Sequence, residues 1–160
     1  MHAMSRPNDV AGSRVDQLVG LYNRYGGTVY ARCRQILGDE AAAEEATQET
    51  FLRAKRHLDR HGEPDNVLGW LFALATSHCL EEVEAAVDRR EPPDEELPGD
   101  RALAARLVAR AEPPLRVVAW LCHVDGMTQD EAARLLALPR RTVVERLARL
   151  DAGTGRRGAG

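Results

Sequence analysis

Residues 126–150 constrain the fold more than any other part of the chain, because they encode a helix, a tight turn and a second helix. Thr128 and Glu131 have the spacing of a capping box, in which the two side chains cap the start of a helix reciprocally. Pro139 cannot continue that helix but suits the first turn of the next one. From Val143 onward, apolar residues recur at helical spacing and leave the arginines facing outward. This layout is typical of a DNA-reading helix-turn-helix.

The same pattern also fits an ordinary helical hairpin with a solvated arginine face, and the uneven charge of the chain bears on the choice. The net charge is −3, which does not indicate nucleic-acid binding by itself. However, residues 130–160 hold seven arginines and four acids, whereas residues 81–100 hold nine acids and two arginines. We therefore expect any DNA contact in the C-terminal part.

The composition predicts an all-α protein. Aromatic residues make up only 4% of the chain, and no segment alternates between apolar and polar residues as a half-buried strand does. The first ten residues are polar, and no stretch approaches the ~20 apolar residues of a membrane span, so we expect a cytoplasmic protein. Three widely spaced cysteines argue against a disulfide framework.

The apolar periodicity predicts two small helical domains. In the first predicted helix, Val15, Val19 and Tyr22 belong to the stripe that we expect to be buried. An acidic, Pro-rich segment separates the domains and is typical of a linker. The C-terminal end is rich in Gly and Arg, which predicts a disordered tail. The predicted boundaries are 13–88 for a three-helix bundle, 89–100 for the linker, 101–150 for the helix-turn-helix domain and 151–160 for the tail.

Both halves resemble the bacterial sigma factors of RNA polymerase, in the extracytoplasmic-function (ECF) group. The first half resembles region two through residues 38–54 and the Gly-Trp-Leu-Phe-Ala-Leu-Ala motif at 69–75. The second half resembles region four through residues 125–128 and 138–147. The resemblance implies that region two binds the clamp helices of core RNA polymerase and melts the downstream promoter element. It implies that region four reads the upstream element and touches the polymerase flap.

The resemblance also implies which residues bind. One set lies on the second predicted helix, where a polar face with one central aliphatic residue can form charge-assisted hydrogen bonds to an arginine-bearing partner helix. The alternative is a merely solvated face. The implied polymerase-binding residues are Glu45, Gln48, Glu49, Leu52 and Arg53. The implied DNA-binding residues are Arg140, Arg141, Thr142, Val144, Glu145, Arg146 and Arg149.

The sequence departs from the family where region two faces the promoter strand. The family has an arginine-asparagine pair and further basic residues there, but this chain has Thr76, Ser77, Glu81, Glu82 and Glu84. Carboxylates repel phosphates, so we expect a divergent, weak promoter-melting segment. In the helix-turn-helix, Arg141, Val144 and Glu145 replace a usual glycine, lysine and serine, and the sequence preference does not follow from them.

No nucleophile motif, phosphate-binding loop or paired-acid site appears, so the sequence predicts neither an enzyme nor a cofactor. The neighbouring pairs His78-Cys79 and Cys122-His123 lack the spacing of a zinc site, and no metal is predicted. We expect a sigma-like protein with core RNA polymerase and promoter DNA as partners, and an anti-sigma factor as a further candidate partner. The alternative is a sigma mimic that binds an anti-sigma factor or the polymerase without melting promoters.

Overall fold

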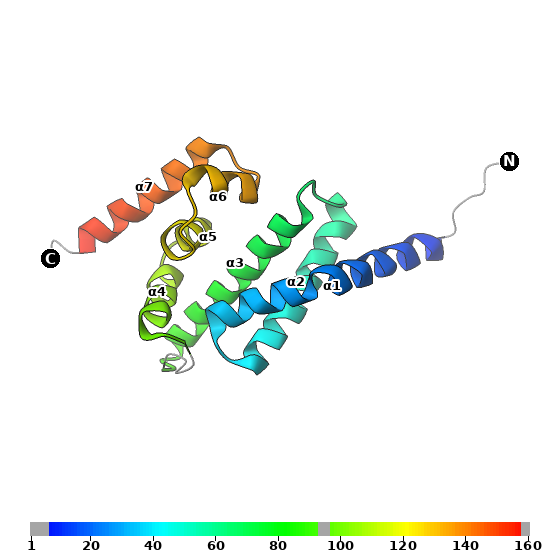
Figure 1. Cartoon of the computed structure of the whole chain (residues 1–160), viewed down its shortest axis with the longest axis horizontal. Coiled ribbons are helices and arrows are strands. Elements are labelled where there is room, and N and C mark those ends of the chain that lie inside the picture. Colours follow the sequence, from blue (N-terminus) through cyan, green and yellow to red (C-terminus); the bar gives the residue numbers. More distant parts are fainter. Residues whose placement is uncertain (1–6, 93–96, 158–160) are drawn as a thin grey trace.

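The computed structural model describes residues 7–92 and 97–157, and every regular element within these ranges is helical (Figure 1). The prediction of an all-α fold is therefore confirmed. No helix in the described part is long and apolar enough to cross a membrane. The elements are α1 (Pro7–Leu37), α2 (Glu40–His61), α3 (Val67–Asp88), α4 (Gly99–Ala109), α5 (Pro113–Ala119), the π-helical turn η1 (Trp120–Val124), α6 (Gln129–Leu136) and α7 (Arg140–Arg157).

Helices α1, α2 and α3 form a three-helix bundle. Local capping sets two of the helix starts: the Asp39 carboxylate accepts the Ala42 amide at 2.8 Å, and the Asn66 side chain accepts the Gly69 amide at 3.0 Å. The bundle buries one continuous apolar cluster. Its members on α2 recur at helical spacing and are Ala43, Ala46, Phe51, Ala54 and Leu58.

Helices α5, α6 and α7 build a second apolar cluster, which forms the predicted helix-turn-helix. The capping box is present, since the Thr128 hydroxyl accepts the Glu131 amide at 3.1 Å and the Glu131 carboxylate accepts the Thr128 amide at 3.3 Å. Ala137 ends α6 in the left-handed conformation, with φ of 53°, and so turns the chain toward α7. Val143 and Leu147 are buried, as predicted.

Helix α3 lies in the middle of the molecule and touches both halves (Figure 1). Helix α4 packs on the first half, although it follows the predicted linker. Trp120, from the second half, belongs to the first apolar cluster, and Phe72 of α3 packs against the second. Each apolar cluster therefore contacts one large aromatic side chain from the other half of the chain.

Two terminal expectations differ from the structure. Helix α1 begins at Pro7 rather than at residue 13, and α7 continues to Arg157, so residues 151–157 are helical where we expected a disordered tail. Elongating a formed helix avoids the cost of nucleation, which helps to explain why the glycines do not end α7. Residues 158–160 and the middle of the linker, 93–96, lie outside the described residues.

Replacing Thr128 with alanine should lower the free energy of unfolding by about 1 kcal/mol, because it removes the hydroxyl that caps α6. Urea unfolding followed by circular dichroism measures this loss. Thr128→Ser is the matched control and should retain most of the stability, because it keeps the hydroxyl. Equal stability of the alanine variant and the wild type would contradict the capping role.

Candidate functional site

The predicted polymerase-binding residues share the solvent face of α2. Glu45, Gln48 and Leu52 are exposed, and Glu49 and Arg53 are half-buried. Leu52 keeps 52% of its surface exposed, so an apolar side chain stands at the centre of a polar face. The structure therefore brings all five residues together, as an α-helix must when residues recur three and four apart.

An ion-pair network fixes the middle of this face. Arg53 donates to the Glu49 carboxylate at 3.3 Å and to the Glu81 carboxylate of α3 at 2.9 Å, and Arg56 donates to Glu49 at 3.0 Å. The hydrogen bond to Glu81 raises the pKa of Arg53. Desolvation opposes the ionisation of Glu49, but the hydrogen bonds from Arg53 and Arg56 outweigh it and lower the pKa of this carboxyl. Both side chains are therefore ionised and preoriented at neutral pH.

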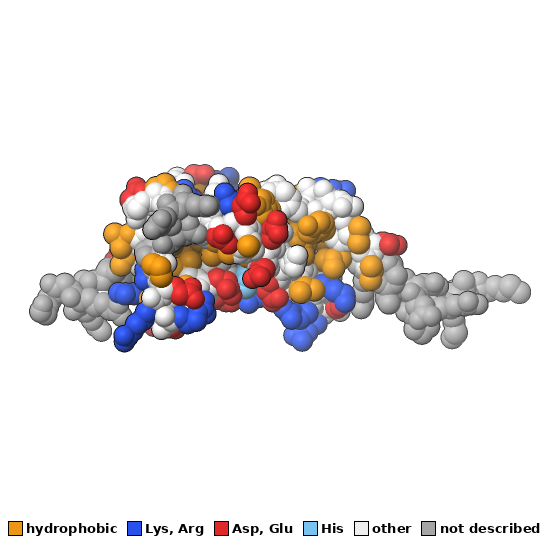
Figure 2. Space-filling view, turned by 90° about the horizontal axis from the view of Figure 1, so that it is seen from below, with side chains coloured by type: hydrophobic (Ala, Val, Ile, Leu, Met, Phe, Trp, Pro, Cys, Tyr) orange, Lys and Arg blue, Asp and Glu red, His pale blue; other side chains and the backbone are white. Residues whose placement is uncertain are grey.

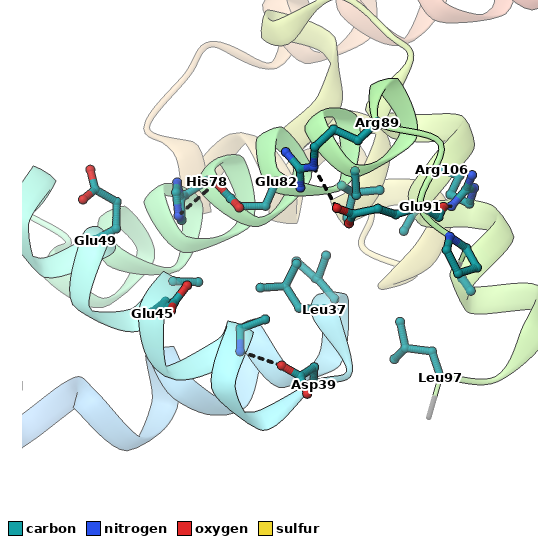
Figure 3. A pocket seen from close by; sticks show the side chains of 18 residues that line it. Leu37, Asp39, Glu45, Glu49, His78, Glu82, Arg89, Glu91, Leu97 and Arg106 are labelled. Carbon is teal, nitrogen blue, oxygen red and sulfur yellow. Dashed lines mark hydrogen bonds and ion pairs between the residues drawn. The ribbon is translucent and has the colours of Figure 1, made fainter. Parts of the chain in front are cut away.

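Glu45 and Glu49 also border a cavity of about 600 Å³ between α2, α3 and α4. Figure 3 shows these two side chains on α2 across from His78 and Glu82 on α3. His78 is buried, and its Nδ1 atom has no hydrogen-bond partner. Burial, and then the charge of Arg53, lower the pKa of His78, which favours the neutral ring. Acidic side chains gather around a histidine on the face seen in Figure 2, so this side of the molecule suits a basic partner.

The three glutamates that we expected to face promoter phosphates have cationic or titratable neighbours instead. Glu81 holds Arg53, and Glu84 lies 2.5 Å from Arg116 of α5. Glu82 lies 4.0 Å from the His78 ring. Glu81 and Glu84 contact different helices although they are three residues apart on α3. The sequence did not reveal the partners of Glu81 and Glu84, because these partners lie 28 or more residues away along the chain.

The predicted DNA-binding residues lie along α7. Arg140, Arg141, Val144, Glu145 and Arg149 are exposed. Thr142 and Arg146 are half-buried. Arg141 and Glu145 lie opposite the buried Val143 and Leu147, so the helix offers an arginine-bearing edge to a groove.

Three of the arginines predicted to bind DNA contact other parts of the folded chain. Arg140 pairs with Asp130 of α6 at 3.1 Å, and Arg149 pairs with Glu112 at 2.6 Å. Both pairs are exposed, so a phosphate can replace either carboxylate at small cost. Arg146 instead lines a shallow groove between α7, α5 and α3.

A family model for sigma-70 region 2 matches residues 21–87. This range contains the second half of α1, all of α2 and all of α3 except its last residue. Alignments to curated proteins extend further. The chain is 26% identical to the ECF RNA polymerase sigma factor SigL of Mycobacterium tuberculosis, over 90% of each chain. The chain is thus similar to ECF sigma factors over most of its length. The matched region contains the whole solvent face of α2.

Two further relatives carry the same description. The chain is 27% identical to the ECF sigma factor SigE of Mycolicibacterium smegmatis over 81% of this chain, and it spans 56% of that protein. It is 29% identical to the ECF sigma factor BldN of Streptomyces coelicolor over 72% of this chain, and it spans 50% of that protein. Among solved structures, the sigma factor RpoE from Bartonella quintana, in complex with the anti-sigma factor NepR, aligns with a TM-score of 0.46 and 14% identity, covering 85% of this chain and 92% of that one.

Sequence reasoning missed the residues that join the two halves. Arg32 of α1 is 2% exposed and pairs with Asp125, and Arg116 is buried beside Glu84. A signal for Arg32 was present, because position 32 falls within the stripe that Val29 and Ile36 define. Conversely, Val15, Val19 and Tyr22, which we expected to be buried, are about half exposed.

Proposed function

We propose that this chain is a sigma factor that binds core RNA polymerase through α2 and promoter DNA through α7. The observation that carries the proposal is the solvent face of α2, where Glu45, Glu49, Leu52 and Arg53 stand together inside the region-2 match. Such a factor acts by binding and orienting the polymerase, so none of these residues has a catalytic role.

The α2 face suits a helix that carries arginines, such as the clamp helices of the polymerase. Its carboxylates are exposed enough to be reached, and Leu52 offers an apolar contact at the centre. Because Arg53 and Arg56 already orient Glu49, less conformational entropy is lost when a partner arginine binds it. The flap contact and the upstream promoter contact belong to the helix-turn-helix half in this proposal.

The rival hypothesis is a sigma mimic that occupies an anti-sigma factor or the polymerase without opening promoters. The glutamates of α3 favour this rival hypothesis, because they replace basic residues of the family pattern. Run-off transcription with purified core polymerase on a pooled genomic promoter library separates the two. Specific transcripts that need the chain support the sigma factor, whereas polymerase binding without any transcript supports the mimic.

Arg140→Ala and Arg141→Ala should each weaken binding to duplex promoter DNA a few-fold, because both side chains are exposed at the start of α7. If each contacts a phosphate, the slope of log K against log salt should become shallower by about one. Fluorescence anisotropy of the full chain over a range of salt concentrations measures both quantities. Arg110→Ala, which removes an exposed arginine at the end of α4, is the control. Unchanged salt slopes for both test variants would exclude phosphate contacts by these arginines.

A further inference from the structure

The cavity between α2, α3 and α4 has the size and the lining of a small-molecule site. Its volume of about 600 Å³ falls within the ~300–1,000 Å³ that such sites usually have. Its wall includes the buried side chains Ile36, Ala46 and Ala105, and the half-buried Val83 adds further apolar surface. A ligand with an apolar body would therefore bury that body against this wall favourably.

The charges around the cavity are balanced at one end and unbalanced at the other (Figure 3). At the balanced end, Arg89 donates to the Glu91 carboxylate at 2.8 Å, and Arg106 donates to the Glu91 carbonyl oxygen at 3.1 Å. At the other end, Glu45 of α2 and Glu82 of α3 line the cavity. Within residues 7–92 and 97–157, no cation pairs with Glu45. The second end therefore carries negative charge that the described chain does not neutralise.

A buried histidine lies at this acidic end. His78 is 7% exposed and lines the cavity, and its Nδ1 atom has no hydrogen-bond partner in the described structure. The Nε2 atom of the same ring lies 4.0 Å from a Glu82 carboxylate oxygen, which is too far for a hydrogen bond. Burial is the main cause that lowers the pKa of His78, and a neutral ring has one nitrogen that accepts a hydrogen bond. A buried acceptor without a partner costs free energy, which a ligand with a suitable donor would recover.

The acidic end therefore offers acceptors to a ligand that has several donors and a positive charge. A primary ammonium group carries three donors, which equals the number of acceptor groups that Glu45, Glu82 and His78 provide. Carboxylates repel an anion, and a neutral alcohol would leave their charge unanswered. In the described part of the chain, no group of three His, Cys, Asp or Glu side chains is placed to hold a metal ion.

We propose that this cavity binds a small organic amine, with its primary ammonium group at Glu45, Glu82 and His78 and its apolar body against the buried wall. The site also bears on the polymerase contact, and this second step rests on the proposed function. Glu45 lines the cavity and belongs to the proposed polymerase-binding face of α2. An ammonium bound to Glu45 neutralises a carboxylate that a polymerase arginine would use, so the amine and the polymerase compete.

Three probes with the same apolar body test the site on the full chain. They are 4-phenylbutylamine, 4-phenylbutan-1-ol and 4-phenylbutanoate, and the amine is charged at neutral pH as lysine is. Titrations followed by ¹H–¹⁵N correlation spectra should shift the amide signals of Ala46 and Val83 with the amine. The alcohol should bind about tenfold more weakly, because it lacks the charge-assisted hydrogen bonds. The carboxylate probe should cause no shift. No binding of the amine at millimolar concentration, or equal affinity of the amine and the alcohol, would overturn the site.

Variants locate the binding in this cavity. Glu82→Gln removes one charge at an exposed position and should weaken amine binding about tenfold. Ala86→Leu fills the cavity from the half-buried side of α3 and should weaken the amine and the alcohol alike. Glu44→Gln is the matched control, since it removes an exposed carboxylate of α2 that does not line the cavity, and it should keep wild-type affinity. Circular dichroism checks that each variant is helical. Wild-type amine affinity of both test variants would place the amine elsewhere and overturn the proposal.

A separate measurement tests the competition. Saturating 4-phenylbutylamine should weaken the binding of the wild type to core polymerase in biolayer interferometry about fivefold, and 4-phenylbutan-1-ol should not. Glu82→Gln lies outside the polymerase-binding face, so this variant should bind polymerase normally and respond little to the amine. Amine binding without any effect on polymerase affinity would overturn the competition and leave the site standing. A wild-type chain that binds the amine but does not bind polymerase would count against the proposed function and not against the site.

Discussion

Replacing Glu45 and Glu49 together with arginine should lower the affinity of this chain for core RNA polymerase by about 100-fold, or about 2.8 kcal/mol. Both carboxylates lie on the accessible face of α2, where the proposed partner presents arginines. The double variant turns two attractive charges into repulsive ones, and losses of this size are typical when a charge pair at an interface is broken. Co-purification and biolayer interferometry with purified core polymerase measure the loss.

The variant should remain folded, because Glu45 and Glu49 lie opposite the buried side of α2. Glu44→Arg is the control: it makes the same charge reversal on the same helix but outside the predicted face, and it should keep near-wild-type affinity. Wild-type affinity of a helical double variant would show that the polymerase binds elsewhere on the chain.

Replacing Trp120 with alanine should lower the free energy of unfolding by about 3–5 kcal/mol, which is a large part of the ~5–15 kcal/mol that stabilises a typical domain. Trp120 is fully buried and joins the first apolar cluster although it comes from the second half of the chain. Its loss removes a large side chain from the core and the anchor of the C-terminal half at once. The midpoint of urea unfolding measures the effect, with tryptophan-independent circular dichroism as the probe.

Val144→Ala is the control for this stability prediction. Val144 is 40% exposed on α7, so its truncation should change the free energy of unfolding by no more than about 0.5 kcal/mol. A Trp120→Ala variant that loses less than about 1 kcal/mol would contradict the placement of this ring in the core.

The sequence predicted the elements whose determinants lie within a few residues of one another. Asp39 caps α2 through the amide of Ala42, and Thr128 and Glu131 cap each other across one turn. Helical periodicity also indicates which side of α2 is buried, and therefore its solvent face with Leu52 at the centre, because residues three and four apart share a side of any α-helix. The proposed polymerase-binding surface was accessible to sequence reasoning for this reason.

The α1 stripe shows where periodicity stops being informative. It identifies a side of the helix but not how far the neighbouring helices extend along it. Tyr22 keeps half of its surface exposed although its edge contacts the Phe51 ring, and Val15 and Val19 are also about half exposed although Leu18 packs against the core. Arg32, a charged residue within the same stripe, is buried instead.

Only the tertiary structure decided how the halves meet and which charges distant in the sequence form pairs. Arg32 pairs with Asp125, which lies 93 residues away in the sequence, and Arg53 pairs with Glu81, which lies 28 residues away. No local rule connects such positions, because their energies depend on burial and on the docking of whole helices. The sequence by itself therefore determined the helices, their caps and the faces they offer, whereas the packing of helices against α3 and the pairing of its glutamates followed only from the assembled fold.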